Sequence, residues 1–285
     1  MVAVVLVTGA SGLLGPYLVE AAAVLGHVVA TGRRGGDRPC DLTDREAVSA
    51  MLADVRPDLV IHAAGMTDVD SCEADEEAAN RVNRDGTTHL ADFLPAKAKV
   101  VYVSTDQVYP DTPGPHAEGE EAPVNVYGRS KLAGEKAVLS RSESLVLRTN
   151  LFGPSLMPGR ASLSDFVATK LAAHEPVTLF RDVLFSPLHM ATLASLLVDC
   201  VKEGLRGVYN LGSRGGMSKL EFGLAVARRL GLSTASVTPG DAVHVPGRAP
   251  RPADLRLVVE RIEGALGRVM PTLNQEISKL EGERP

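Results

Sequence analysis

The chain has 285 residues, of which 45% are hydrophobic and 23% are charged, and its formal net charge is −5. A chain of this length buries roughly three quarters of its unfolded surface, so it can fold without disulfide or metal staples. With no basic excess, no Trp and only 4% aromatic residues, the sequence argues against nucleic-acid binding and against attachment to an anionic membrane surface.

The three cysteines, Cys40, Cys72 and Cys200, are far apart and form neither a CxxC pair nor a zinc pattern with the seven histidines. This usage predicts a reduced, cytoplasmic location and no metal site. The apolar start of the chain runs directly into Thr8-Gly9, so it is interpreted as a strand rather than a signal peptide. No apolar run approaches the length of a membrane span.

The first half of the chain alternates short β-branched apolar runs with helical patterns. The predicted strands cover residues 2–7, 27–31, 58–61, 99–104 and 145–148, and the predicted helices cover residues 12–25, 44–53, 76–93 and 127–140. Asp41 or Thr43 could cap the second of these helices. Such alternation predicts an α/β fold with a Rossmann-like, doubly wound parallel sheet.

Residues 108–125 interrupt this rhythm with several Pro and Gly residues, which predict a long and functional surface loop. Later patterns predict helices at 163–173, 191–201 and 218–230, a strand at 207–211 and an extended segment at 237–256. We therefore expect a NAD(P)-binding Rossmann domain at residues 1–150. A smaller C-terminal α/β substrate-binding region at residues 151–285 would be interleaved with it through crossing strands.

A glycine-rich turn, TGASGLLG at residues 8–15, follows the first strand and opens the first helix. Glycines permit a tight turn and a close approach of the backbone to a pyrophosphate, and the helix start supplies free N–H groups. At the first strand-to-helix turn of a βαβ pattern this motif predicts dinucleotide binding. The predicted cofactor residues here are Gly9, Ser11, Gly12, Leu13, Leu14 and Gly15.

The end of the second predicted strand indicates which cofactor is bound. NAD sites usually carry Asp or Glu there, whereas this chain has Arg33 and Arg34. Two guanidinium groups match a 2′-phosphate, so NADPH is predicted, with NADH as the second choice. Asp41 and Leu42 follow where the returning chain could meet the adenine. Ala63-Ala64-Gly65, after the third strand, is small enough to let the cofactor lie across the strand ends.

The fourth predicted helix begins with Tyr127 and carries Lys131 four residues later, so both side chains share one face. A cation beside a phenol lowers the pKa of the phenol, which is how a tyrosine can exchange protons near neutral pH. A core tyrosine and a lysine paired with Glu135 would be the simpler reading of this spacing. Thr105 and Asp106 end the fourth strand, and a hydroxyl there could hold a carbonyl oxygen of the substrate.

Together with the glycine-rich turn, the Thr105, Tyr127 and Lys131 set resembles the extended short-chain dehydrogenase/reductase family. Within it, the chain is similar to the dTDP-4-dehydrorhamnose reductase branch. The stretches that carry this resemblance are CDLTD (40–44), PDLVIHAAGMTDVDSCE (57–73), STDQVY (104–109), NVYGRSKLAGEKAV (125–138), LRTNLFG (147–153), GVYNLGS (207–213) and PRPADLRL (250–257).

The resemblance implies an NADPH-dependent reductase of a nucleotide-linked 4-keto-6-deoxy sugar, and it leaves open a homodimer. Tyr127 would protonate the carbonyl oxygen as hydride reaches C4. Lys131 would hold the nicotinamide ribose and lower the tyrosine pKa, while Thr105 and Asp106 would bind the sugar. The implied cofactor contacts are Gly12, Leu13 and Leu14 at the pyrophosphate, Asp41 and Leu42 at the adenine, and Ala63, Ala64 and Thr67 at the middle. Asn150 and Arg251 complete the predicted substrate residues.

The chain departs from the family pattern at Gln107, at Asn150-Leu151, at residues 183–188 and at residues 253–255. Most of these departures fall in the half expected to choose the sugar. Two alternative functions therefore stay open. One is a regulatory subunit that binds NADP without turnover, as the beta subunit of methionine adenosyltransferase resembles this branch. The other is a sugar-nucleotide epimerase or dehydratase.

Each of two further groups of charged residues can be interpreted in two ways. Arg248 and Arg251 could hold a nucleotide diphosphate or could be exposed arginines of a Pro-rich loop. The acidic run at residues 68–77 could bind a metal ion, but acidic residues also stabilise a helix start, and the second interpretation is favoured.

Overall fold

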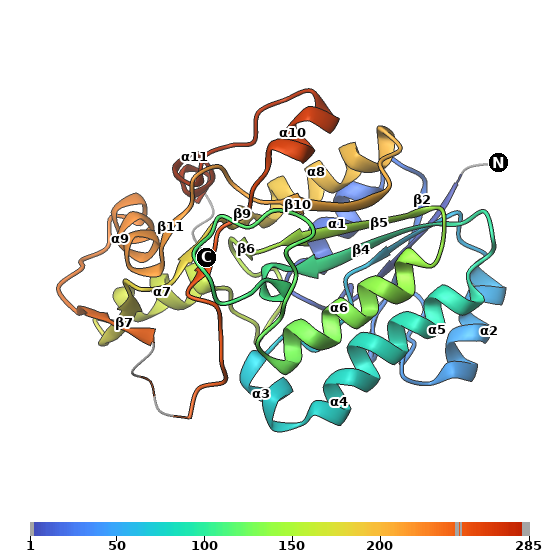
Figure 1. Cartoon of the computed structure of the whole chain (residues 1–285), viewed down its shortest axis with the longest axis horizontal. Helices are drawn as coiled ribbons and strands as arrows, with labels where there is room; N and C mark the ends of the chain where they lie inside the picture. Colours follow the sequence, from blue (N-terminus) through green and yellow to red (C-terminus); the bar gives the residue numbers. More distant parts are fainter. Residues whose placement is uncertain (1–2, 243–244, 246, 281–285) are drawn as a thin grey trace.

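The computed structural model describes residues 3–242, 245 and 247–280. At its centre lies a six-stranded sheet with the order β10-β5-β4-β3-β1-β2, in which every neighbouring pair is parallel (Figure 1). Its strands are β1 (Val4–Thr8), β2 (His27–Thr31), β3 (Leu59–His62), β4 (Lys99–Thr105), β5 (Ser144–Thr149) and β10 (Gly207–Leu211). The predicted Rossmann-like parallel sheet is confirmed.

Helices cover both faces of this sheet. Helices α1 (Gly15–Ala22) and α8 (Met190–Lys202) pack together on one face, whereas α2 (Arg45–Val55), α5 (Gly86–Phe93) and α6 (Val126–Leu139) cover the other (Figure 1). Alternate residues of β4 enter different cores: Val101 packs with the α1 and α8 side, and Tyr102 packs with the α2 and α5 side. Burial on both faces explains why the strands are nearly continuous apolar runs.

The helix predicted at residues 76–93 is interrupted. It consists of α4 (Glu76–Asn80), a π-helical turn η1 (Arg81–Asp85) and α5, and a further short helix, α3 (Val69–Ala74), precedes it. Asp68 and Asp75 accept backbone hydrogen bonds at the starts of α3 and α4, so part of the acidic run serves as helix caps. The π turn places Asn83 in the interior with 1% of its surface exposed.

The cap of α2 differs from the prediction. Asp44, rather than Asp41 or Thr43, accepts hydrogen bonds from the backbone N–H groups of Glu46 and Ala47. The Asp41 carboxylate instead accepts from the backbone and the hydroxyl of Thr43. The prediction was wrong because both carboxylates precede the helix, and only the backbone geometry decides which one reaches its free N–H groups.

The residues after β5 form a smaller region beside the carboxyl edge of the main sheet (Figure 1). Its small sheets have the orders β11-β8-β13, β12-β7 and β6-β9. Its elements, apart from α8 and β10, are β6 (Leu151–Phe152), α7 (Leu163–Ala172), β7 (Val177–Phe180), β8 (Leu184–Phe185), β9 (Leu188–His189), β11 (Met217–Ser218), α9 (Lys219–Leu230), β12 (Val237–Gly240), β13 (Asp254–Leu255), α10 (Glu260–Leu266) and α11 (Leu273–Ser278). The predicted helices at 163–173, 191–201 and 218–230 are confirmed.

The predicted strand at 207–211 is also confirmed, and as β10 it joins β5 in the main sheet. The proposed boundary at residue 150 remains a prediction. The segment predicted to be extended, 237–256, contains β12 and β13, while residues 243, 244 and 246 within it lie outside the described part. Across the described ranges, no helix is both long enough and apolar enough to span a membrane.

Candidate active site

The carboxyl ends of β1 and β3 lie side by side, although the chain passes from β1 to β2 on the other side before it returns. In open α/β sheets such a reversal is where ligands bind. Gly9 follows β1 with φ +74°, and a Cβ there would lie 2.6 Å from the backbone nitrogen of Ala64. Only glycine fits this contact, which brings the predicted turn against the predicted Ala63-Ala64-Gly65 segment.

The glycine-rich turn is compact and leads directly into α1. A Cβ on Gly15 would lie 2.3 Å from the carbonyl oxygen of Ala10, so the helix start is folded tightly onto the turn. No side chain caps α1, and Pro16 stands in its first turn. The backbone N–H of Gly12 donates to the carbonyl oxygen of Gly9 at 2.8 Å, whereas those of Leu13 and Leu14 have no backbone partner among the described residues. The two free groups suit an anionic ligand, and the turn fits the pyrophosphate of a dinucleotide.

Arg33 and Arg34 are exposed just after β2. A Cβ on the preceding Gly32 would lie 2.8 Å from Oγ of Ser11, so the end of β2 borders the glycine-rich turn. The pKa of Asp41 lies below its usual value, first because of the hydrogen bond from the Thr43 backbone and also because of the nearby Arg33 charge. Two accessible guanidinium groups at this position fit a 2′-phosphate.

Asn83, which is not predicted from the sequence, fixes the middle of the predicted cofactor site. Its side chain accepts from the backbone N–H of Met66 at 2.8 Å and donates to the Met66 carbonyl at 2.9 Å. It also donates to Oγ of Ser130 on α6 at 2.9 Å. These bonds join Gly65 and its neighbours to the helix that carries Tyr127. Nothing in a helical pattern marks one Asn as buried, because the π turn that points it inward leaves no sequence signal.

Thr105 and Tyr127 lie together at the end of β4, and both side chains are buried. Burial raises the pKa of Tyr127, while its hydrogen bond with the Thr105 side chain acts in the opposite direction. The direction is contrary to the expected lowering by Lys131, because removal of the phenol from water has the larger effect. Tyr127 is therefore a protonated phenol at neutral pH, which is the form that can donate a proton.

Lys131 is 3% exposed and donates a hydrogen bond from Nζ to the carbonyl oxygen of Val103 at 2.8 Å. Burial lowers the pKa of Lys131 to about 7, and the nearby Glu135 carboxylate opposes this shift. A Cβ on Gly65 would lie 3.9 Å from Nζ, so the ammonium borders the predicted cofactor segment. The predicted pair thus lies at the predicted place, but the lysine is buried rather than a surface residue.

Helix α6 is anchored on three sides. Asn125 caps it by accepting from the backbone N–H of Gly128 at 2.7 Å. A Cβ on Gly128 would lie 2.1 Å from the carbonyl oxygen of Gln107, so the glycine lets the helix start press against the short 3-10 turn Asp106–Val108 that follows β4. Further along, Glu135 accepts from Ser104 at 2.5 Å and from Nη2 of Arg148 on β5 at 2.7 Å. Tyr127 and Lys131 are therefore held relative to Thr105 by buried polar contacts.

Asp106 and Asn150, both predicted to contact substrate, are in direct contact. The Asn150 amide donates to the Asp106 carboxylate at 2.6 Å. Asp106 is 1% exposed, and burial raises its pKa to about 6. The hydrogen bonds from Asn150 and Thr105 act against this rise. A carboxyl group that titrates near neutral pH thus lies next to Thr105.

The C-terminal region brings three cations towards this end of the sheet. Lys219, Arg248 and Arg251 are close enough that Arg251 lowers the pKa of both Lys219 and Arg248, although burial is the largest cause for each. Burial and these charges lower the pKa of Lys219 to about 8, while Asp106 opposes the shift. Lys219 is not predicted from the sequence, because the first residue of an amphipathic helix carries no sign of what it faces.

Arg251 is occupied by a partner. Its two terminal nitrogens pair with both carboxylate oxygens of Asp70, at 3.0 and 2.8 Å, and Asp70 also accepts from the backbone N–H of Ala249. Asn125 donates to the carbonyl oxygen of Pro250 at 3.0 Å. These contacts tie residues 249–251 to α3 and to the start of α6. Lys219 and Arg248, in contrast, form no ion pair within the described part of the chain.

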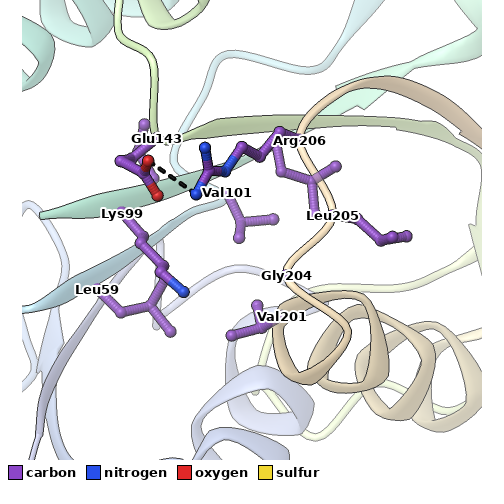
Figure 2. Close-up of a pocket in the computed structure, with 10 residues that line it drawn as sticks. Leu59, Lys99, Val101, Glu143, Val201, Gly204, Leu205 and Arg206 are labelled. Carbon is purple, nitrogen blue, oxygen red and sulfur yellow. Dashed lines mark ion pairs between the residues drawn. The ribbon is translucent and has the colours of Figure 1, made fainter.

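A separate pocket lies at the amino edge of the main sheet. Figure 2 shows that Lys99, Glu143, Leu205 and Arg206 surround it and that Arg206 pairs with Glu143, at 2.9 Å. These residues precede or begin β4, β5 and β10, whereas Thr105 ends β4. The pocket is therefore on the opposite edge from the candidate active site and does not contribute to it.

Comparisons with known proteins agree with this arrangement. A family model described as the RmlD substrate binding domain matches residues 3–282. The chain is 32% identical to the probable low-salt glycan biosynthesis reductase Agl14 of Haloferax volcanii over 96% of both chains. It is 34% identical to the dTDP-4-dehydrorhamnose reductase of Mycolicibacterium smegmatis, covering 87% of this chain and 76% of that protein. The crystal structure of dTDP-4-dehydrorhamnose reductase from Bacillus anthracis in complex with NADP matches with a TM-score of 0.90, 25% identity and full coverage of both chains.

Proposed function

Because the chain belongs to the RmlD substrate-binding domain family and is a dTDP-4-dehydrorhamnose reductase-like oxidoreductase, we propose that it reduces the C4 carbonyl of a nucleotide-linked 4-keto-6-deoxy sugar with NADPH. The observation that carries this proposal is that Thr105, Tyr127 and Lys131 lie at the end of β4, with Lys131 next to the Ala63-Ala64-Gly65 segment that packs against the glycine-rich turn. These groups supply a hydroxyl to hold the carbonyl oxygen, a phenol to protonate it and an ammonium next to the cofactor segment.

In the proposed reaction the bound NADPH supplies hydride to the carbonyl carbon. The hydroxyl of Thr105 holds the carbonyl oxygen, and Tyr127 transfers its phenolic proton to that oxygen, so the product is an alcohol. Burial keeps Tyr127 protonated until charge develops on the oxygen. The positive charge of Lys131 then stabilises the tyrosinate that remains. Asp106 and Asn150 lie where they could orient the sugar hydroxyls.

The proposed cofactor is NADPH rather than NADH, on the strength of Arg33 and Arg34. We assign its pyrophosphate to the turn between Gly9 and Gly15 and its adenine to Asp41 and Leu42. Its middle would lie along Ala63, Ala64, Gly65 and Thr67. The relative from Bacillus anthracis was crystallised with NADP, which supports this choice.

The proposed substrate carries an anionic linker, and the charges of the C-terminal region support this. Lys219, near Asp106, and Arg248, near Asp70 and Asp182, offer two cations that form no direct ion pair within the described residues. A nucleotide diphosphate would supply the missing negative charge. Arg251 belongs to the same group, but its pairing with Asp70 favours a role in holding residues 249–251 in place.

The test is to mix the protein and NADPH with a panel of nucleotide-linked 4-keto-6-deoxy sugars, beginning with dTDP-4-dehydrorhamnose, while following the absorbance of the reduced nicotinamide. We expect oxidation of NADPH with at least one sugar and much slower oxidation of NADH. Tight NADPH binding without oxidation for any sugar would contradict the proposal and would favour a regulatory role.

A further inference from the structure

We propose that Tyr102 is a positioning residue for Lys131: its buried ring holds the lysine ammonium at the end of β4, next to the cofactor segment. This inference rests on the proposed function only where activity is measured. Its physical content, an ammonium seated on an aromatic face, stands on the contacts of the two residues.

The ammonium of Lys131 has two partners on adjacent residues of one strand. Nζ lies 3.9 Å from the centroid of the Tyr102 ring and 2.8 Å from the carbonyl oxygen of Val103. The face of an aromatic ring carries negative potential, and this attraction grows when water is excluded. Tyr102 is fully buried and Lys131 is 3% exposed, so the contact is dry. The ring therefore substitutes for part of the water that the ammonium loses.

The ring itself is held in place from two sides. On β3 the imidazole of His62 lies 5.1 Å away between centroids, tilted by 34°. On α6 the residue facing the phenol end is Gly134, where a Cβ would lie 2.5 Å from the Tyr102 hydroxyl. A glycine is thus required for this helix to pass the tyrosine. The hydroxyl lies near Thr87 without forming a hydrogen bond of normal geometry, so the phenyl face, rather than the hydroxyl, is what the site uses.

His62 does not compete as a second cation, because its hydrogen bonds define a neutral form. Thr87 donates its hydroxyl proton to the carbonyl oxygen of Asn83 at 2.7 Å, so it must accept a proton from Nε2 of His62, at 2.9 Å. Nδ1 then accepts from the Thr8 hydroxyl at 2.7 Å. Burial, followed by the charge of Lys131, lowers the pKa of His62 to about 3. His62 carries its proton on Nε2 and stays uncharged at neutral pH.

The remaining groups that bear on Lys131 are on α6. Glu135 favours its charged form, but Glu135 is itself paired with Arg148 of β5. Tyr127 is a protonated phenol. With the pKa of Lys131 already lowered to about 7 by burial, its charge at neutral pH depends on each remaining favourable contact. Loss of the Tyr102 ring should reduce the charged fraction and let the ammonium move.

The experiment compares Tyr102→Phe, which keeps the ring, with Tyr102→Leu, which removes it. The titration of Lys131 is followed by NMR of lysine labelled with ¹³C at Cε, with Lys131→Met to assign the signal. We expect the wild-type midpoint in Tyr102→Phe and a midpoint lower by about one pH unit in Tyr102→Leu. The same midpoint in both variants would overturn the proposal, and this readout needs no substrate.

If Tyr102→Leu does not fold, phenylalanines with increasing numbers of fluorine atoms are introduced at position 102. Fluorine withdraws charge from the ring face with little change of shape, so the Lys131 midpoint should fall stepwise. An unchanged Lys131 midpoint through the series would refute the proposal that the Tyr102 ring face holds the ammonium. Where a sugar substrate is found, the pH profile of kcat should shift with the same midpoints. If the Lys131 midpoint shifts but no sugar is turned over, the proposed role of Tyr102 stands and the proposed reaction is contradicted.

Discussion

Thr105, Tyr127 and Lys131 lie inside the layers of the parallel sheet, whereas Lys219 and Arg248 approach the same end of the sheet from the C-terminal region. The first three are buried, and neighbouring elements supply hydrogen-bond partners for them. The other two are half-buried, and within the described residues they form no direct ion pair with a carboxylate, although the charges of Asp106, Asp70 and Asp182 act on them. We infer that the sheet side sets the geometry of proton transfer, while the C-terminal side keeps positive charge available for an anionic substrate.

The largest expected effect tests the sheet side. Tyr127→Phe keeps the ring but removes the proton donor, so we expect NADPH oxidation to fall by about 10²- to 10⁴-fold. NADPH binding should hardly change, as measured by fluorescence titration. A Tyr127→Phe protein with full activity would show that the proton comes from another group.

Asp106 lies between the two sides, and its ionisation should cost stability. Because burial raises its pKa to about 6, the folded protein binds more protons than the unfolded chain between about pH 4 and pH 6. The free energy of unfolding should therefore decrease as pH rises through this window. Asp106→Asn removes this pH dependence. The free energy of unfolding of the variant minus that of wild type should therefore increase by about 2 kcal/mol between pH 4 and pH 8.

Denaturant unfolding of Asp106→Asn and wild type at both pH values measures this difference. The exposed Glu203, at the end of α8, provides the control variant Glu203→Gln, which should follow wild type. If the free energies of unfolding of Asp106→Asn and wild type differ by the same amount across the pH range, the pKa of the Asp106 carboxyl group is not raised by burial.

Arg33 and Arg34 are exposed residues on the sheet side, and both are proposed to bind the 2′-phosphate. Arg33→Ala should reduce the preference for NADPH over NADH by about tenfold, because one charge-assisted hydrogen-bonding group is lost. The ratio of kcat/KM values for the two cofactors measures this preference. Arg38→Ala is the matched control, because Arg38 is paired with Asp54. An unchanged ratio in Arg33→Ala would assign the phosphate to Arg34 or to neither arginine.

The smallest expected effect tests the C-terminal side. Lys219→Met should raise the KM for the nucleotide sugar by about fivefold, with little change in kcat or in NADPH binding, since one partly exposed cation is lost. Arg214→Gln provides a control, because Arg214 is in the same region but is paired with Glu263. A decrease in kcat without a change in KM would indicate that Lys219 acts in the reaction rather than in substrate binding.

The sequence predicts the reactive residues at the end of the sheet far better than the buried residues that hold them in place. The glycine-rich turn and the Tyr127 and Lys131 spacing are local patterns that can be read from neighbouring residues, and in the structure Lys131 borders Gly65, whose segment packs against the turn. Tyr102 reaches Lys131, and Asn83 reaches Met66, only because separate elements pack against each other, and one chain does not reveal that packing. The prediction that the pKa of Tyr127 is lowered was wrong for the same reason, since the extent of burial cannot be read from the spacing of two residues.

Strand β10 reaches the sheet last. Until residue 211 has been synthesised, the outer edge of β5 has no strand to pair with, although the glycine-rich turn, Thr105 and Tyr127 already exist. An unpaired edge of this kind invites pairing with another chain. A fragment that stops near residue 150 should therefore aggregate rather than fold as a small dinucleotide-binding protein. The cofactor side of the molecule thus depends, during synthesis, on a strand from the part that is proposed to choose the sugar.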